Sequence, residues 1–117
     1  MAHFKGVKDQ LRVKVKARIP LDEGKFQTVP FVCIYKVPDV PTARQLTKDA
    51  QDGAINDQEV VDEYLVGWDK LLDENDDPIE FSPENVNDAM DLAPYARAIV
   101  GGFLELLFGR EALKRKN

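Results

Sequence analysis

The chain has 117 residues, of which 44% are apolar and 32% are charged, so it is long enough for one hydrophobic core and too apolar for a disordered protein. No apolar run reaches the length that spans a bilayer, and the first residues lack the apolar stretch of a signal peptide. The single cysteine, Cys33, excludes an internal disulfide, and we expect a protein of the reducing cytoplasm.

The net charge of −5 is distributed unevenly along the chain. Residues 1–36 carry eight basic and three acidic side chains, residues 37–91 carry three basic and sixteen acidic ones, and residues 92–117 carry five basic and two acidic ones. Such charges can be solvated, paired within the chain or paired between copies in an assembly. A homo-oligomer is therefore one expectation.

A β-hairpin is expected in the first 37 residues. Apolar and basic residues alternate from position 11 to position 19, which is typical of a strand with one face in water. Asp22-Glu23-Gly24 supplies a turn, and a second strand follows over residues 26–37.

The second strand has apolar residues at every position from 31 to 35, so both of its faces should be covered. Pro30 indicates a strand edge or a bulge. Because a hairpin alone is marginally stable in water, it needs helices against it, a third strand, or pairing with another chain. Residues 4–7 are the candidate for that third strand.

Four helices are expected over residues 38–109. The first, over residues 41–51, has a thin apolar stripe and should lie on the surface. The second starts at Asn56, which has capping-box spacing to Glu59, and its apolar residues recur at helical spacing as far as Leu72, with Trp68 as a core anchor.

Ser82 and Pro83 start the third helix, which runs to about Asp91, and Pro94 opens the last helix. Gly101 and Gly102 each cost roughly 1 kcal/mol relative to Ala inside that helix, a cost that close packing or a kink would explain. The sequence thus predicts a single α+β domain over residues 1–117. Its N-terminal hairpin packs against about four helices over residues 38–109, and a basic tail follows over residues 110–117.

Residues for catalysis do not assemble in this pattern. The single histidine, His3, lies at the N-terminus and has no partner set for nucleophilic or metal chemistry. Cys33 is interpreted as a small buried apolar residue, and no glycine-rich phosphate loop is present. We expect a protein that is not an enzyme and that holds no cofactor.

One segment resembles a calcium-binding EF-hand loop. Asp73, Asn75, Asp77 and Glu84 occupy ligand positions one, three, five and twelve, with a predicted helix on each side. The sixth position, which requires a glycine with positive φ, is Pro78. We therefore interpret the segment as an acidic turn and expect no metal site, although a calcium-responsive module is a hypothesis to test.

Two other partner classes, nucleic acid and membranes, fit the sequence less well. The basic strand face, Arg12, Lys14, Lys16 and Arg18, could meet phosphates, but it has no interleaved aromatic residues and the chain is acidic overall. The last helix with its basic tail could lie on a membrane, but its apolar residues are more simply core. We expect no nucleic acid and no membrane as partner.

A longer pattern covers much of the second half of the chain. It comprises Val66-Gly67-Trp68, the acidic turn Asp73-Glu74-Asn75-Asp76, then Pro78-Ile79-Glu80-Phe81-Ser82-Pro83-Glu84-Asn85-Val86, and Leu92-Ala93-Pro94-Tyr95. It resembles the tail assembly chaperones of long-tailed bacteriophages and prophages over roughly residues 55–108. The chain departs from them at Asp77, where the turn often carries Gly.

The resemblance implies a function without catalysis. Such chaperones bind the long, apolar tape-measure protein in the host cytoplasm and keep it soluble while tail-tube subunits polymerise around it. The tail-tube protein is a further implied partner. An alternative function is a structural component of the virion, such as a tail-completion or connector protein.

A chaperone of this type needs an apolar surface that recognises helices. Two surfaces are candidates: the outer side of the last helix, with Phe103, Leu107 and Phe108, and the edge of the hairpin, with Phe31, Cys33 and Tyr35.

Overall fold

The computed structural model describes residues 4–109, so His3 and the basic tail over residues 110–117 lie outside the described residues. Its elements are β1 (Gln10–Pro20), β2 (Phe26–Lys36), α1 (Val40–Gln51), α2 (Asp57–Tyr64), β3 (Leu65–Asp69), α3 (Pro83–Met90) and α4 (Ala93–Phe108). The predicted α+β class, with an N-terminal hairpin and four α-helices, is confirmed. In the described part of the chain, no helix is long and apolar enough to cross a membrane.

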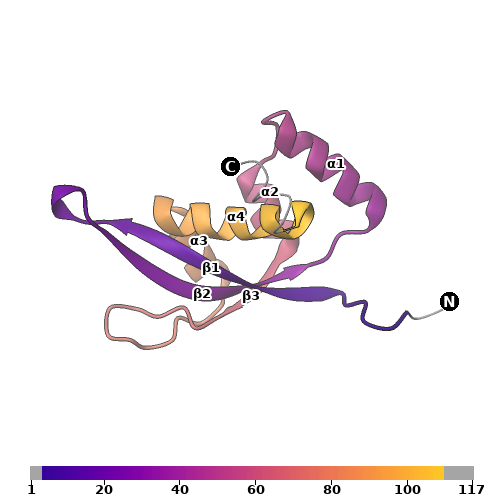
Figure 1. Cartoon of the computed structure of the whole chain (residues 1–117). Helices are drawn as coiled ribbons and strands as arrows, with labels where there is room; N and C mark the ends of the chain where they lie inside the picture. The colour runs from indigo at the N-terminus through magenta and orange to yellow at the C-terminus, as the bar shows by residue number, and fades with distance from the viewer. Residues whose placement is uncertain (1–3, 110–117) are drawn as a thin grey trace.

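The hairpin has the alternation that the sequence predicts. β1 and β2 pair antiparallel along their full lengths, with Val13 opposite Cys33 and Val15 opposite Phe31. Because successive side chains of a strand point to opposite faces, these odd-numbered residues share one face of the sheet. That face is buried against the helices, which lie on one side of the sheet in Figure 1. The lysines and arginines of β1 are at even-numbered positions and occupy the other face.

The third strand is not the one that we predicted. Residues 4–7 form no strand, and β3 comes instead from the segment that we expected to continue the second helix to Leu72. The sheet order is β1-β2-β3, so β2 is the central strand. Where β3 pairs with it, β2 has a neighbouring strand on both sides. A central position supplies hydrogen-bond partners on both edges of β2. Of its apolar residues, Phe31, Cys33 and Tyr35 belong to the core, and Val32 on the opposite face is also buried.

The helix α2 ends at Tyr64 because the chain changes period there. Val60, Val61 and Tyr64 are buried at helical spacing, but Leu65 is already extended, with φ −79° and ψ 111°. From that point the backbone satisfies its hydrogen bonds by pairing with β2, whose apolar stretch would otherwise have an open edge. Gly67 permits this pairing closely, since a Cβ there would lie 3.3 Å from Ile34 Cδ1.

The helix α4 crosses the buried face of the sheet at Gly102. A Cβ at Gly102 would lie 2.5 Å from the Tyr35 hydroxyl and 2.6 Å from Val15 Cγ1, whereas one at Gly101 would meet no atom within 4 Å. The Tyr35 hydroxyl donates a hydrogen bond to the Ile99 carbonyl of α4. The prediction of close packing is therefore confirmed for Gly102, where the contact between α4 and the sheet leaves no room for a side chain.

The helix starts follow local sequence signals. Asn56 accepts a hydrogen bond from the Glu59 amide and Ser82 accepts one from the Asn85 amide, so both predicted caps are present. The helix α1 has no buried residue, as its thin apolar stripe predicts, and it stands apart from the sheet in Figure 1.

Candidate functional site

The residues that carry the chaperone-like pattern form one connected unit. Trp68, on β3, donates its indole N–H to the Ile79 carbonyl at 2.8 Å, and its ring meets Phe81 edge-on with centroids 5.1 Å apart. The Asn85 side-chain amide donates to the Glu80 carbonyl at 2.8 Å. The tryptophan therefore ties the end of the sheet to the segment that leads into α3.

The acidic turn between β3 and α3 is closed by its own hydrogen bonds. One carboxylate oxygen of Asp73 accepts from the Asn75 amide at 2.8 Å and from the Asp77 amide at 3.0 Å. Leu72 and Pro78 face each other in an isolated bridge. A strand, not a helix, precedes this turn, so the expectation of a helix on each side is wrong. In residues 4–109, no three His, Cys, Asp or Glu side chains come together as a metal site.

A groove of about 870 Å³ runs between this unit and the far half of the hairpin. Its apolar lining combines the two sides: Ile19, Val29, Trp68, Leu72, Leu92 and Tyr95. Carboxylates also line it: Asp73, Glu74, Asp76 and Asp88. Leu72 and Leu92 are 39% and 53% exposed, respectively, so apolar surface is open to solvent here. We call this feature the groove.

The groove exists because β3 is short. β3 pairs with β2 only from Val32 to Tyr35, so the residues of β2 from Phe26 to Phe31 have no strand on that side. Pro30 lies in this unpaired stretch, where its missing N–H removes no bond to β3. The hairpin arm thus projects beyond the helices, as Figure 1 shows, and forms one wall of an open depression.

The outer face of the sheet is the second distinctive surface. We use this term for the even-numbered side chains of β1 and β2 together with Gly67 and Asp69 of β3, the face opposite the helices. Its charged residues are five basic and one acidic: Arg12, Lys14, Lys16, Arg18, Lys36 and Asp69. Val32 and Ile34 lie among them and are buried and half-buried, respectively.

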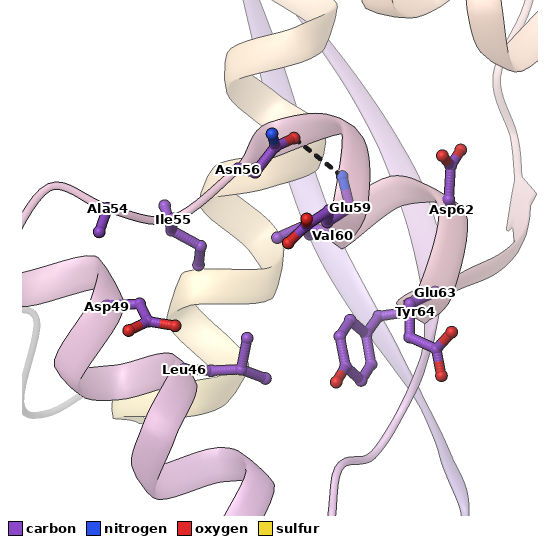
Figure 2. A pocket seen from close by; sticks show the side chains of 10 residues that line it. All are labelled: Leu46, Asp49, Ala54, Ile55, Asn56, Glu59, Val60, Asp62, Glu63 and Tyr64. Carbon is purple, nitrogen blue, oxygen red and sulfur yellow. Dashed lines mark hydrogen bonds between the residues drawn. The ribbon is translucent and has the colours of Figure 1, made fainter.

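A smaller pocket of about 360 Å³ lies between α1 and α2. Figure 2 shows Leu46 of α1 and Tyr64 of α2 on facing sides of it, and the Asn56 cap at its rim. The carboxylates of Glu59 and Glu63, which also line it, are exposed. This pocket is the seam between α1 and α2, and these two carboxylates are solvated.

The six predicted partner-binding residues divide between core and surface. Phe31, Cys33, Tyr35 and Phe103 are at most 2% exposed, so in the single chain they are core and form no open surface. Their burial follows from the central position of β2 and from the face of α4 that packs on it. Leu107 and Phe108 are half-buried near the end of α4 and keep some accessible surface.

Burial also determines the chemistry of Cys33 and Tyr35. Desolvation raises the pKa of the Cys33 thiol to about 11, so the thiol is protonated at neutral pH and is a poor nucleophile. Desolvation likewise raises the pKa of Tyr35 well above its ordinary range. Both side chains act as core residues.

Sequence reasoning missed the groove, although it identified the residues of one wall. Leu72 and Leu92 were placed in or beside helices, and Ile19 and Val29 in the hairpin. Nothing in the sequence shows that these four residues, distant in sequence, line the same depression. The chain matches no protein-family model, no curated protein and no solved structure.

Proposed function

We propose that this protein is a tail assembly chaperone of a long-tailed phage or prophage, which acts in the host cytoplasm and has no catalytic activity. The observation that carries the proposal is the groove. Residues of the chaperone-like pattern between Trp68 and Tyr95 line one of its walls, where Leu92 of the pattern and the neighbouring Leu72 are exposed. A chaperone needs such an open apolar surface to hold a client that would otherwise aggregate.

The client that we propose is an apolar segment of the tape-measure protein. The carboxylates of Glu74, Asp76 and Asp88 beside the groove keep the chaperone soluble and favour a segment with basic residues next to its apolar ones. A homo-oligomer would present several grooves along one long client, which raises the overall affinity without new contacts. The tail-tube protein is a further proposed partner.

The test is co-expression with the tape-measure protein encoded nearest downstream of this gene. We expect the tape-measure protein to be insoluble alone and to co-purify with this chain. The double substitution L72E/L92E places two charges in the groove at exposed positions, so it should abolish co-purification while the chain stays folded.

The matched control is Val40→Glu. Val40 is 63% exposed and lies on α1, outside the groove, so its substitution should leave co-purification unchanged. Equal loss with both variants would contradict the groove as the site. A tape-measure protein that precipitates in every case would contradict the chaperone function, and retention of the chain in purified particles would favour the virion-component alternative.

A further inference from the structure

We infer that the outer face of the sheet binds a second copy of this chain, head to tail, through the acidic segment over residues 73–91 of that copy. This inference concerns the chain alone and does not depend on the proposed client. It rests on two surfaces of opposite charge, and on the charged groups of each that have no partner within the described chain.

Within residues 4–109, the helices pack on one face of the sheet, and the outer face carries none of them. The helices contribute their buried residues to the opposite, odd-numbered face, where Val15, Phe31 and Cys33 meet Ile99 and Phe103. On the outer face, Lys14 lies opposite Val32 and Lys16 opposite Pro30, and both lysines are exposed. The centre of this face is therefore apolar and its surroundings are basic.

Three of the five basic residues already have partners. Arg12 pairs with Asp69 at 2.6 Å, Lys36 pairs with Glu63 at 3.4 Å, and the Arg18 guanidinium lies 3.8 Å from the centroid of the Phe26 ring. Among residues 4–109 no carboxylate pairs with Lys14 or Lys16. These two lysines are available to an incoming acidic group.

The acidic segment is the complementary surface. Residues 73–91 contain eight acidic residues and no basic one, and all eight are exposed. In the described part of the chain, none of the eight takes part in an ion pair. Lys14 and Lys16 on one surface and the eight carboxylates on the other thus remain unpaired within the described chain, and two copies can pair them.

A second copy fits this face better than a polyanion does. The net charge of −5 opposes a polyanion, which carries one charge per phosphate, more strongly than it opposes a second copy with the same −5. A second copy brings the carboxylates on a protein segment that is closed by its own hydrogen bonds, from the Asn75 and Asp77 amides to Asp73. Because the two surfaces are different, the contact is heterologous and not a two-fold dimer.

The experiment compares two charge-reversed variants, alone and mixed. K14E/K16E lowers the net charge of the outer face from +4 to 0, and E74K/D77K changes that of the acidic segment from −8 to −4 without touching Asp73. K5E/K8E is the matched control, since it changes the net charge as K14E/K16E does but lies outside the sheet. Sedimentation velocity gives the oligomeric state, at about 0.1 M and at about 1 M salt, where the Debye length falls from about 10 Å to about 3 Å.

The wild-type chain and K5E/K8E should associate at the lower salt concentration and dissociate at the higher one. Each reversed variant alone should associate at least about tenfold more weakly. An equimolar mixture of the two should associate again, because the intact acidic segment of K14E/K16E meets the intact outer face of E74K/D77K. Circular dichroism and thermal melts establish that every variant is folded.

Several outcomes would overturn the inference. They are a wild-type chain that is monomeric at both salt concentrations, a K14E/K16E variant that still self-associates, and a mixture that stays monomeric although both variants are folded. Binding of duplex DNA to the wild-type monomer, lost in K14E/K16E, would assign the face to nucleic acid instead.

Discussion

The two faces of the sheet are made by the same two strands and have opposite properties. On the buried face, Val15, Phe31 and Tyr35 pack against α4 so closely that one helix position must be glycine. On the outer face, Lys14 and Lys16 are exposed and have no carboxylate partner in the described chain. The comparison teaches that one strand pattern specifies both a packed core and an open surface for association.

The largest expected effect tests the close packing of the buried face. Gly102→Ala should lower the free energy of unfolding by about 3 kcal/mol, because the added methyl overlaps Tyr35 and Val15, both held in the core. Gly101→Ala is the matched control in the same helix and should raise stability by up to about 1 kcal/mol. Urea denaturation of both variants measures the difference, and a change of the same sign would contradict the packing.

A comparable effect is expected at high pH, again from the buried face. The pKa of Cys33 is about 11 in the folded chain against an ordinary 9.0, so the unfolded chain loses the thiol proton first as pH rises. The contribution of this thiol to the free energy of unfolding is therefore fully present below about pH 9. It is lost as pH rises from there through 11, by about 2–3 kcal/mol in total.

Denaturation at about pH 8 and about pH 10 tests this slope. Cys33→Ala should reduce the loss between these two values, since the group that titrates first is gone. The loss that begins above pH 10 should remain, because the pKa of Tyr35 is raised as well. An unchanged slope in Cys33→Ala would assign the pH dependence to other groups.

A smaller effect is expected where the sheet meets the groove. Trp68→Phe keeps an aromatic ring but removes the N–H that donates to the Ile79 carbonyl, so stability should fall by about 1 kcal/mol. Amide hydrogen exchange should also become faster in residues 70–82. If exchange there were unchanged, the tryptophan would not be the residue that holds this segment.

The smallest effect is expected on the outer face. Arg12→Ala and Asp69→Ala break an exposed ion pair of 2.6 Å, and exposed pairs are screened by solvent. Their thermal melting temperatures should be close to that of the wild-type chain. The pKa of Asp69, which the hydrogen bond from Arg12 lowers, should return toward its ordinary value in Arg12→Ala, as NMR titration would show.

The period of the sequence predicted much of the fold and misled at one place. The alternation from Leu11 to Ile19 gave the strand and both of its faces, and Asn56 and Ser82 gave two helix starts. The segment from Leu65 to Leu71 has apolar residues that fit a helix as well as a strand. The spacing of apolar residues does not distinguish a helix from a strand here. The segment becomes a strand because the edge of β2 is free to pair with it.

The candidate surfaces, like the fold, were predicted where they depend on contiguous residues and missed where they depend on distant ones. The sequence marked the chaperone-like residues and the basic strand, since both are contiguous patterns. It placed Phe31, Cys33, Tyr35 and Phe103 on an open surface, and they are core because β3 and α4 cover them. The groove was beyond prediction, because its walls come from residues 19–30 and 68–95.

The sequence by itself determined the class of the fold, the hairpin, the helix caps and the separation of basic from acidic segments, because each depends on neighbours along the chain. Only the tertiary structure decided which strand completes the sheet, which glycine of α4 is a contact, and where apolar surface stays open. Those outcomes depend on which distant segments meet, and that is set by the competition for the edge of β2 and for the face of α4.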